Sequence, residues 1–416
     1  MELEKYSMGI GDRFGYECAA QLRAIQKATA RGTPITPVWN KSVREHTIAG
    51  TVPAAARIAA DAAVQTCQWV APYHVDADHI GLETVGPFLP NHDFFTIDIA
   101  DFIGTHTDSR STASFRAAMS PYKGTMTIPG LRAPLEVTDI TLADFTQKYL
   151  RAIAEAGRIY RHIAAMKGNG SFIAEVSIDE ARSAQTAVEL FLILAAIARE
   201  EIPIQTIAPK FTGKFLKGID YAGDIGQFTE DFNDYLAVIA FSVNNFSLPH
   251  NLKLSIHTGS DKFSLYPIMH EAIKNANAGI HLKTAGTTWL EEVIGLAASG
   301  GEGLEIAKAI YRDSFLRYDE LVAPYLAVID IDKDRLPEPQ EVDSWSSEEF
   351  VLALRHDGLC DRYNEHLRQL LHIGFKVAAD MDERFVKVLG ECRDAIEENV
   401  TVNLYDGHIR PLFLGE

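Results

Sequence analysis

Acidic and histidine side chains stand together where several apolar segments end. The sharpest case is VDADHI, in which Asp76, Asp78 and His79 close a run of apolar residues. Strand alternation places Asp76 and Asp78 on one face and His79 on the other, unless the strand ends at that point. Imidazole nitrogens and carboxylate oxygens are ligands that divalent cations accept. The segment therefore predicts a metal site, although a capping aspartate beside a surface histidine explains the same residues.

Three further segments end in the same way. SIHTGSDKF carries His257 at the end of an apolar run, and the backbone amides of residues 258–260 can hold an oxyanion or a hydroxyl group. GIHLKTAGT places His281 and Lys283 two residues apart, hence on one face of a strand. AEVS contributes Glu175. A lone strand histidine is more often a buried core residue than a ligand, but three at separate strand ends beside carboxylates favour a functional site.

Basic side chains occupy comparable positions and can meet an anionic substrate. They are Arg13, Lys41, Lys210, Lys214, Lys262 and Lys283. In a chain of net charge −18, cations that converge on one cleft would point to a bound anion. The other reading is that each lysine is solvated at its strand end, and the sequence leaves both open.

Eight apolar segments separated by helical ones position these side chains. They end at Asp12/Arg13, Lys41, Asp78/His79, Asp98, Glu175, Lys210, His257 and His281/Lys283. Eight parallel strands with helices between them form a (β/α)8 barrel, whose active site lies at the C-terminal strand ends. We therefore expect an α/β fold, a TIM-type barrel, with the polar clusters around its mouth.

The rest of the chain predicts an insertion and an extension. Helices are expected over residues 16–31, 53–68, 142–166 and 181–200. Residues 102–136, after the fourth strand, are rich in Thr, Ser, Gly and Pro, and we interpret them as an excursion above the barrel mouth: a lid, a homo-oligomer contact or decoration. We expect a catalytic barrel over residues 1–300 and a helical extension over 301–416, with a turn at Asp406-Gly407.

Composition and charge exclude several classes of protein. The 416 residues are 47% hydrophobic and 23% charged, as in ordinary globular proteins. The negative net charge argues against nucleic-acid binding, no apolar run is long enough to span a membrane, and four scattered cysteines indicate reduced thiols. We expect a cytoplasmic protein that binds neither nucleic acid nor membrane. The phosphate-binding glycine motifs and the G-x-S-x-G elbow are absent, which leaves nicotinamide, nucleotide and serine-hydrolase chemistry without support.

Taken in chain order, the motifs resemble one known family. MGIGDRFG, PVWNKSVREH, HVDADHI, FTIDIADF, AEVSIDE, APKFTGKFLKGIDYAGD, SIHTGSDKF and HLKTAGTTW are similar to the tagaturonate epimerases of hexuronate catabolism, from about residue 8 to residue 292. The resemblance implies a metal-dependent TIM-type barrel that interconverts D-tagaturonate and D-fructuronate, with relatives that act on the neutral ketohexoses tagatose and fructose. It implies His79, His257 and His281 as metal ligands, and Asp78 and Glu175 as acid/base groups.

The same blocks supply the substrate-binding candidates. These are Arg13, Lys41, Lys210, Asp220, Ser260, Asp261, Lys262 and Lys283. The substrate is a small sugar or sugar acid, and the cofactor is a divalent cation for which zinc, manganese, nickel and cobalt are not distinguished.

Such a substrate calls for retro-aldol chemistry. The two sugar acids differ at the carbon β to the ketone, whose C–H is not acidic, so enolisation does not invert it. In this route the metal acts as a Lewis acid at the ketone, and a carboxylate base removes the proton from the β-hydroxyl, which opens the C–C bond. Re-addition then occurs on the other face of the aldehyde. Asp78 is the preferred base, and Glu175 is its partner on the opposite face. Transient oxidation is the competing route and needs a nicotinamide. The other functions left open are a metal-dependent aldolase or lyase and a non-catalytic sugar-acid-binding protein.

Overall fold

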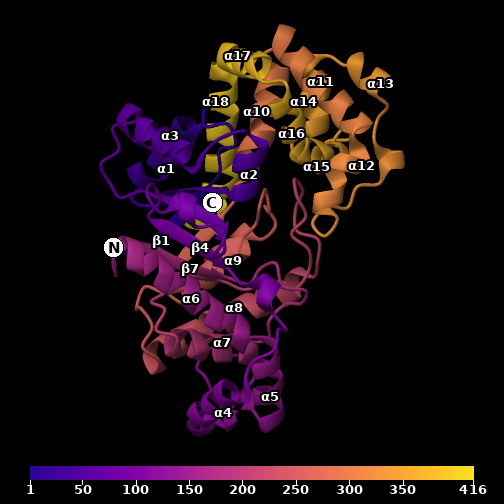
Figure 1. Cartoon of the computed structure of the whole chain (residues 1–416). Coiled ribbons are helices and arrows are strands. Elements are labelled where there is room, and N and C mark those ends of the chain that lie inside the picture. The colour runs from indigo at the N-terminus through magenta and orange to yellow at the C-terminus, as the bar shows by residue number, and fades with distance from the viewer.

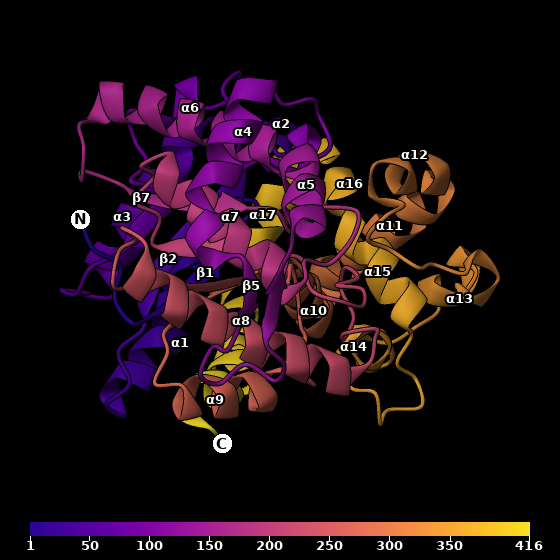
Figure 2. The ribbon, with the colours of Figure 1, turned by 90° about the horizontal axis from the view of Figure 1, so that it is seen from below.

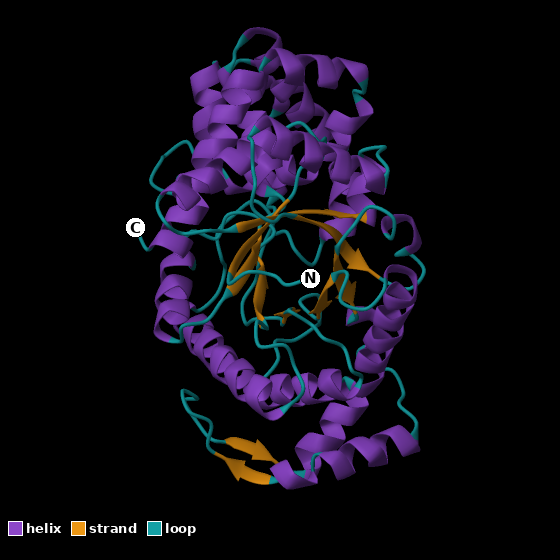
Figure 3. Cartoon of the chain, turned by 90° about the vertical axis from the view of Figure 1, so that its left-hand side faces the viewer, coloured by secondary structure: helices purple, strands orange, loops and turns teal.

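The centre of the molecule is a closed barrel of eight parallel strands. The computed structural model describes all 416 residues. The strands pair in the order β1-β10-β9-β8-β7-β4-β3-β2. Their bounds are β1 (Tyr6–Ile10), β2 (Thr36–Ser42), β3 (His74–Ile80), β4 (Phe94–Asp98), β7 (Ile173–Ser177), β8 (Thr206–Ala208), β9 (Lys253–His257) and β10 (Ile280–Lys283). All eight predicted strands are confirmed, and Figure 3 shows them as a ring inside a ring of helices.

Helices between the strands cover the outside of the barrel. They are α1 (Cys18–Ala30), α2 (Val43–Ile48), α3 (Pro53–Thr66), α6 (Leu150–Lys167), α7 (Ala187–Arg199), α8 (Ile225–Asn245), α9 (Tyr266–Asn275) and α10 (Thr287–Ala298), with a 3₁₀ turn, η1 (Gly86–Phe88), before β4. The single helix predicted over residues 142–166 is two helices, because the chain breaks at Tyr149, whose ring is fully buried and packs beside Phe145.

The insertion after β4 packs beside the barrel helices rather than over the strand ends. It comprises η2 (Ala100–Phe102), α4 (Ser109–Ala118), η3 (Ser120–Tyr122), the antiparallel hairpin β5 (Gly124–Met126) and β6 (Leu135–Val137), and α5 (Asp139–Lys148). Tyr122 packs its ring against Phe191 of α7 and against Phe246, just after α8. Figure 3 shows the hairpin outside the helical ring, on the side opposite the C-terminal helices.

The chain after α10 forms a helical extension against one side of the barrel. Its elements are α11 (Gly301–Leu316), α12 (Tyr318–Val322), η4 (Ala323–Tyr325), η5 (Lys333–Arg335), α13 (Pro339–Asp343), α14 (Ser347–Leu354), α15 (Glu365–Ile373), α16 (Phe375–Asp380), α17 (Glu383–Glu391), α18 (Arg393–Val402) and a π-helical segment, η6 (Asn403–Leu414). The extension is the orange-to-yellow group in Figure 1, and Figure 2 shows it from below beside α10. One continuous apolar core of 103 residues includes barrel and extension side chains.

Two contacts hold the C-terminal half of the chain against the barrel. The turn expected at Asp406-Gly407 does not form, because these residues lie inside η6, where a Cβ on Gly407 would come within 2.8 Å of the Phe263 ring. The indole of Trp289 on α10 is fully buried and donates to the carbonyl of Leu371 on α15. The first contact ties the extension to the loop after β9, and the second ties it to α10. No helix in the structure combines the length and the apolar character that crossing a membrane requires.

Candidate active site

The C-terminal strand ends bring the predicted acids and histidines together inside the barrel mouth. Parallel pairing sets Lys283 of β10 opposite His257 of β9, and Glu175 of β7 opposite Thr96 of β4. Side chains on alternate residues of each strand point inward, so these residues share the upper layer of the barrel interior. Glu175 is completely buried there, and Lys283 is 3% exposed.

A break in strand alternation turns His79 toward the same space. The register of β3 against β4 shifts between Ala77 and Ile80, and His79 has φ +50°, in the left-handed region that non-glycine residues rarely adopt. Its ring centroid lies 5.3 Å from that of His257. A strained backbone of this kind is typical of functional sites, where the surrounding structure holds it in place.

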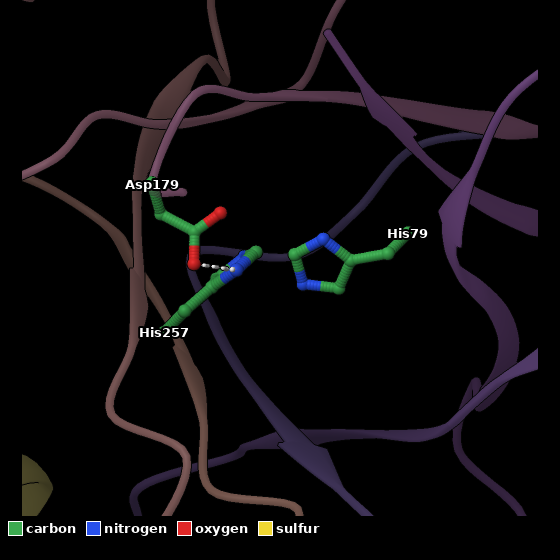
Figure 4. Close-up of side chains that lie close together, drawn as sticks. All are labelled: His79, Asp179 and His257. Atoms are coloured by element: carbon green, nitrogen blue, oxygen red, sulfur yellow. Dashed lines mark ion pairs between the residues drawn. The ribbon is translucent and has the colours of Figure 1, made fainter. Parts of the chain in front are cut away.

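His79, Asp179 and His257 form a group that can hold a metal ion. Each residue offers one ligand atom, and these atoms lie within 4.8 Å of one another. Asp179 Oδ2 is 3.1 Å from His257 Nδ1, and Figure 4 shows the His79 ring facing this pair from the other side. His257 Nδ1 is buried and faces Asp179 Oδ2 in an ion pair that lacks hydrogen-bond geometry, so a bound ion would give this nitrogen a partner.

Outer carboxylates orient both imidazoles of this group. Glu175 Oε1 lies 2.8 Å from His257 Nε2, and Asp98 Oδ2 lies 3.0 Å from His79 Nδ1. A carboxylate behind each histidine is the arrangement that fixes the ring and its tautomer in metal sites. The carboxylates also favour positive charge here: burial lowers the pKa of His257, but Asp179 and Glu175 outweigh it and raise that pKa to about 9. The donor set fits a divalent cation.

Lys283 neutralises the acids beneath the histidine group. Its ammonium contacts Asp76 Oδ2 at 2.7 Å, Asp78 Oδ1 at 2.8 Å and Glu175 Oε1 at 3.1 Å. Gly9, opposite Lys283 on β1, makes room for the lysine stem, because a Cβ there would come within 2.6 Å of Lys283 Cγ. One buried cation therefore serves three buried carboxylates.

This shared cation separates the pKa values of the three acids. Burial alone would raise the pKa of Asp78, but the Lys283 ammonium together with His79 and His257 outweighs burial and holds that pKa below its usual value. The pKa of Glu175 is held well below its usual value by the same balance. Burial wins at Asp76 and, with help from the neighbouring carboxylates, raises its pKa to about 6. Acids of different proton affinity side by side are suited to acid/base work.

The structure does not bring His281 to the histidine group. His281 lies two residues below Lys283 on β10, level with Ser255 rather than with His257. Its Nδ1 lies 2.9 Å from Ser7 Oγ, and burial, the largest influence, lowers its pKa to about 3. Asp179 stands in the position that the sequence interpretation assigned to a third histidine.

Four of the predicted substrate-binding residues make internal contacts instead. Lys262, fully buried, donates to the carbonyls of Leu216 and Ile219 as well as to Ser260 Oγ. Ser260 Oγ also accepts from the amide of Gly218. Two loops are joined in this way, and the lysine has no donor left for a ligand.

The two remaining acids of this group serve the same structural purpose. Asp220 accepts from the amide and hydroxyl of Ser264. Asp261 is fully buried and pairs with Arg368 at 2.6 Å, and with His356 and His408 at 3.1 Å each. Asp261 thus anchors the helical extension to the loop after β9.

The other predicted cations lie around the rim. Lys210 donates to the carbonyl of Asp179, which places it next to the metal-ligand group. Lys41 donates to the carbonyl of Arg13 at 2.6 Å. Arg13 in turn donates to the carbonyl of His372, 359 residues away in the chain.

Sequence reasoning missed Asp179, and Asp98 was noted only as a strand end. Asp179 lies four residues after Glu175, inside the AEVSIDE motif. The motif therefore contained this second acid, but sequence reasoning did not assign it as a metal ligand. Asp98 ends β4, one strand away from His79, and only pairing of β3 with β4 brings the two together.

One surface groove lies at the opposite end of the barrel. Its volume is about 770 Å³, and it is lined by the N-terminal segment, α8 and the residues before β9 and β10. It contains none of the clustered acids or histidines described above. Because active sites of this fold sit at the C-terminal strand ends, we assign the chemistry to the histidine end.

Comparison with known proteins identifies similar sequences and folds. A family model described as tagaturonate epimerase matches residues 1–405. The tagaturonate/fructuronate epimerase of Thermotoga maritima is 27% identical over 413 residues, which cover 96% of this chain and 79% of that protein. The native crystal structure of fructuronate-tagaturonate epimerase from Cohnella laeviribosi has a TM-score of 0.80 at 23% identity, covering 98% of this chain and 82% of the other. A two-glycerol complex of that protein has a TM-score of 0.81 at 24% identity, covering 99% and 82%.

Proposed function

The chain belongs to the tagaturonate epimerase family, and from that premise we propose that it interconverts D-tagaturonate and D-fructuronate with the help of a divalent cation. The similarity to the Thermotoga maritima tagaturonate/fructuronate epimerase, which spans nearly the whole chain, supports this substrate pair. The single observation that carries the proposal for this chain is the buried group of two histidines and one aspartate at the strand ends, backed by outer carboxylates.

His79, Asp179 and His257 would hold the cation. Bound there, a divalent ion supplies Lewis acidity that stabilises negative charge on the ketone oxygen of the substrate. Glu175 and Asp98 act as positioning residues, since each holds one imidazole by its far nitrogen. Lys210 keeps Asp179 in place through its carbonyl.

Asp78 is the proposed base. In the forward step it takes the proton from the β-hydroxyl, the bond between the α- and β-carbons breaks, and its electron pair passes to the ketone half of the substrate. The β-carbon becomes an aldehyde, which rotates. Re-addition forms the C–C bond on the other face, and Asp78 returns the proton to the new hydroxyl. Lys283 keeps Asp78 ionised for the first step, and Asp76, whose pKa is about 6, can share the proton through the same ammonium.

NMR of sugar acids incubated with the protein tests the proposal. Protein stripped with a chelator and reloaded separately with manganese, cobalt, nickel or zinc is incubated with D-tagaturonate, and the appearance of D-fructuronate is followed. We expect turnover only after reloading. His257→Ala should lose both bound metal and turnover, whereas His162→Ala, an exposed histidine on α6, should lose neither.

The products separate the competing functions. Release of three-carbon fragments without epimer indicates an aldolase or lyase. Binding of tagaturonate without any conversion indicates a non-catalytic binding protein. Turnover by the stripped protein, or full metal content in His257→Ala, would refute the proposed metal site.

A further inference from the structure

A second group of polar side chains meets above the barrel mouth, and part of it comes from the helical extension. The β8–α8 loop, residues 209–224, contributes Lys217; the β1–α1 loop contributes Arg13; and α15 contributes His372. The extension and the loop are in direct contact, because Arg368 of α15 donates to the carbonyl of Gly218. In Figure 1, α15 lies at the lower edge of the extension, above the loops that rise from the barrel.

His372 is buried without any hydrogen-bond partner. It is 1% exposed, and neither ring nitrogen has a partner in the structure. Its ring rests on the loop after β10, because a Cβ on Gly286 would come within 2.2 Å of His372 Nε2. A buried polar atom that makes no hydrogen bond costs free energy. Such an atom in a native protein therefore indicates a hydrogen-bond partner, for example a ligand, from outside the chain.

Lys217 is a cation without a counter-ion. Its ammonium makes no ion pair or hydrogen bond, and its nearest aromatic neighbour is the Tyr325 ring, 5.9 Å away. Burial, followed by repulsion from Arg13, lowers the pKa of Lys217. Lys217 is half-buried, and a partly desolvated cation that makes no ion pair would gain from an anion supplied from outside the chain.

Arg13 adds a second incompletely paired cation. Its Nη1 donates to the backbone carbonyl of His372, and its guanidinium stacks 4.0 Å from the centre of the Phe375 ring. Its Nε is buried without a hydrogen bond, and the nearest carboxylate, that of Glu45, is 3.5 Å from it. The neighbourhood of His372 is therefore cationic, in a chain whose net charge is −18.

The group lies close to the metal-ligand residues. Lys217 Nζ is 4.0 Å from where a Cβ on Gly259 would stand, and Gly259 is two residues beyond His257, at most about 7 Å of chain. Gly286, beneath His372, donates its amide to the carbonyl of Gly259. In a hexulosonate the carboxyl carbon is four bonds from the ketone carbon, about 5 Å when extended. Both ends of one substrate can thus be held at once.

We propose that Lys217, Arg13 and His372 form the subsite for the carboxylate of the substrate, and that the helical extension supplies its histidine. The inference rests on the proposed function. It assigns to this subsite the preference for a sugar acid over a neutral ketohexose. Retro-aldol cleavage places the carboxylate on the aldehyde half of the substrate, the half that rotates. Holding that carboxylate keeps the aldehyde in the site until the C–C bond forms again, while the proton and the electron pair move as described above.

Paired substrates test this assignment. D-Tagaturonate and D-tagatose share a chain but differ in a carboxylate against a hydroxymethyl group. Lys217→Met should lower kcat/KM for the sugar acid about 10- to 100-fold, mostly through KM, as expected for a lost charge-assisted contact, and leave the value for tagatose nearly unchanged. Lys217→Arg should restore most of the loss. Lys214→Met, at an exposed position in the same loop, serves as the control.

His372→Gln and His372→Leu test the part of the subsite that comes from the extension. Gln retains an N–H donor and should keep more sugar-acid activity than Leu. The Leu variant should release more of the three-carbon aldehyde acid and dihydroxyacetone per epimer formed, because the aldehyde half is no longer held. Melting curves of both variants report whether the helices still pack.

Several results would overturn the subsite. Equal loss of activity on both substrates indicates a structural role for Lys217, and unchanged sugar-acid kinetics indicates none. If the wild-type protein converts tagatose but not tagaturonate, the carboxylate subsite is wrong while epimerisation stands. If it converts neither, the proposed function fails, and calorimetric binding of tagaturonate to wild type and to Lys217→Met still decides the subsite by whether affinity falls.

Discussion

Replacing Lys283 by methionine removes the one cation that contacts all three of Asp76, Asp78 and Glu175. The methionine side chain occupies a similar volume, so the change is mainly one of charge. The ammonium sits 2.7–3.1 Å from one oxygen of each acid, and all four groups are largely or fully buried. Removing one partner of a buried pair costs about 3–5 kcal/mol, which in a chain of 416 residues lowers Tm by about 3–6 °C.

The deficit should depend on pH with a definite sign. In the wild-type protein, Lys283 opposes burial and holds the pKa values of Asp78 and Glu175 below their usual range, so the stability they contribute is present at neutral pH and lost in acid. Without the ammonium, burial and mutual repulsion raise these pKa values above those of the unfolded chain. Folding of the variant is then favoured at low pH and weakened as pH rises, so its deficit should be larger at about pH 8 than at about pH 5.

Thermal unfolding followed by circular dichroism measures both effects. Lys210→Met is the matched control, because that ammonium donates to a backbone carbonyl and neutralises none of the three acids. It should lower stability by no more than about 1 kcal/mol. Adding Asp78→Asn to Lys283→Met should restore part of the stability by removing one unpaired charge. A Tm of Lys283→Met close to wild type, or a deficit that is the same at both pH values, would refute the buried ion cluster.

Four further outcomes are expected. His281→Asn should retain bound metal, unlike His257→Ala, when metal content is measured by atomic emission; its loss would return His281 to the ligand set. Asp78→Asn should reduce turnover about 10²-fold or more with the fold intact, and Asp76→Asn should cost less; the reverse order would exchange their roles. In D₂O the epimerised product should carry no deuterium at the inverted carbon by NMR, because a C–C bond breaks there; deuterium at that carbon would exclude the retro-aldol route. Glu17→Gln should raise Tm at about pH 8 but not at about pH 4. Burial, aided by Asp12, raises the pKa of Glu17 from 4.5 to about 8, so the wild-type protein loses stability as pH rises between these two values. An equal gain in Tm at both pH values would contradict this prediction.

Local sequence was enough to predict the barrel. Each strand is a short apolar run that ends in a polar cluster, and in a parallel sheet those ends must meet at one edge. The eight strands, the long insertion and the helical extension follow from that pattern and are present. The choice of Asp78, Glu175 and His257 as neighbours rests on the same local rule, because each lies at the end of an apolar run and the ends of parallel strands meet.

Only the tertiary structure decided which polar groups share a site. His79 joins His257 through a bulge and a left-handed residue, which strand alternation does not foresee. His281 drops out because β10 sets it one layer lower, and Asp179 enters from a loop whose path depends on packing. The group around His372 requires contact between residues 359 positions apart. Strand ends are specified by neighbouring residues along the chain, whereas loop conformations and the seating of the extension depend on burying apolar surface across the whole fold.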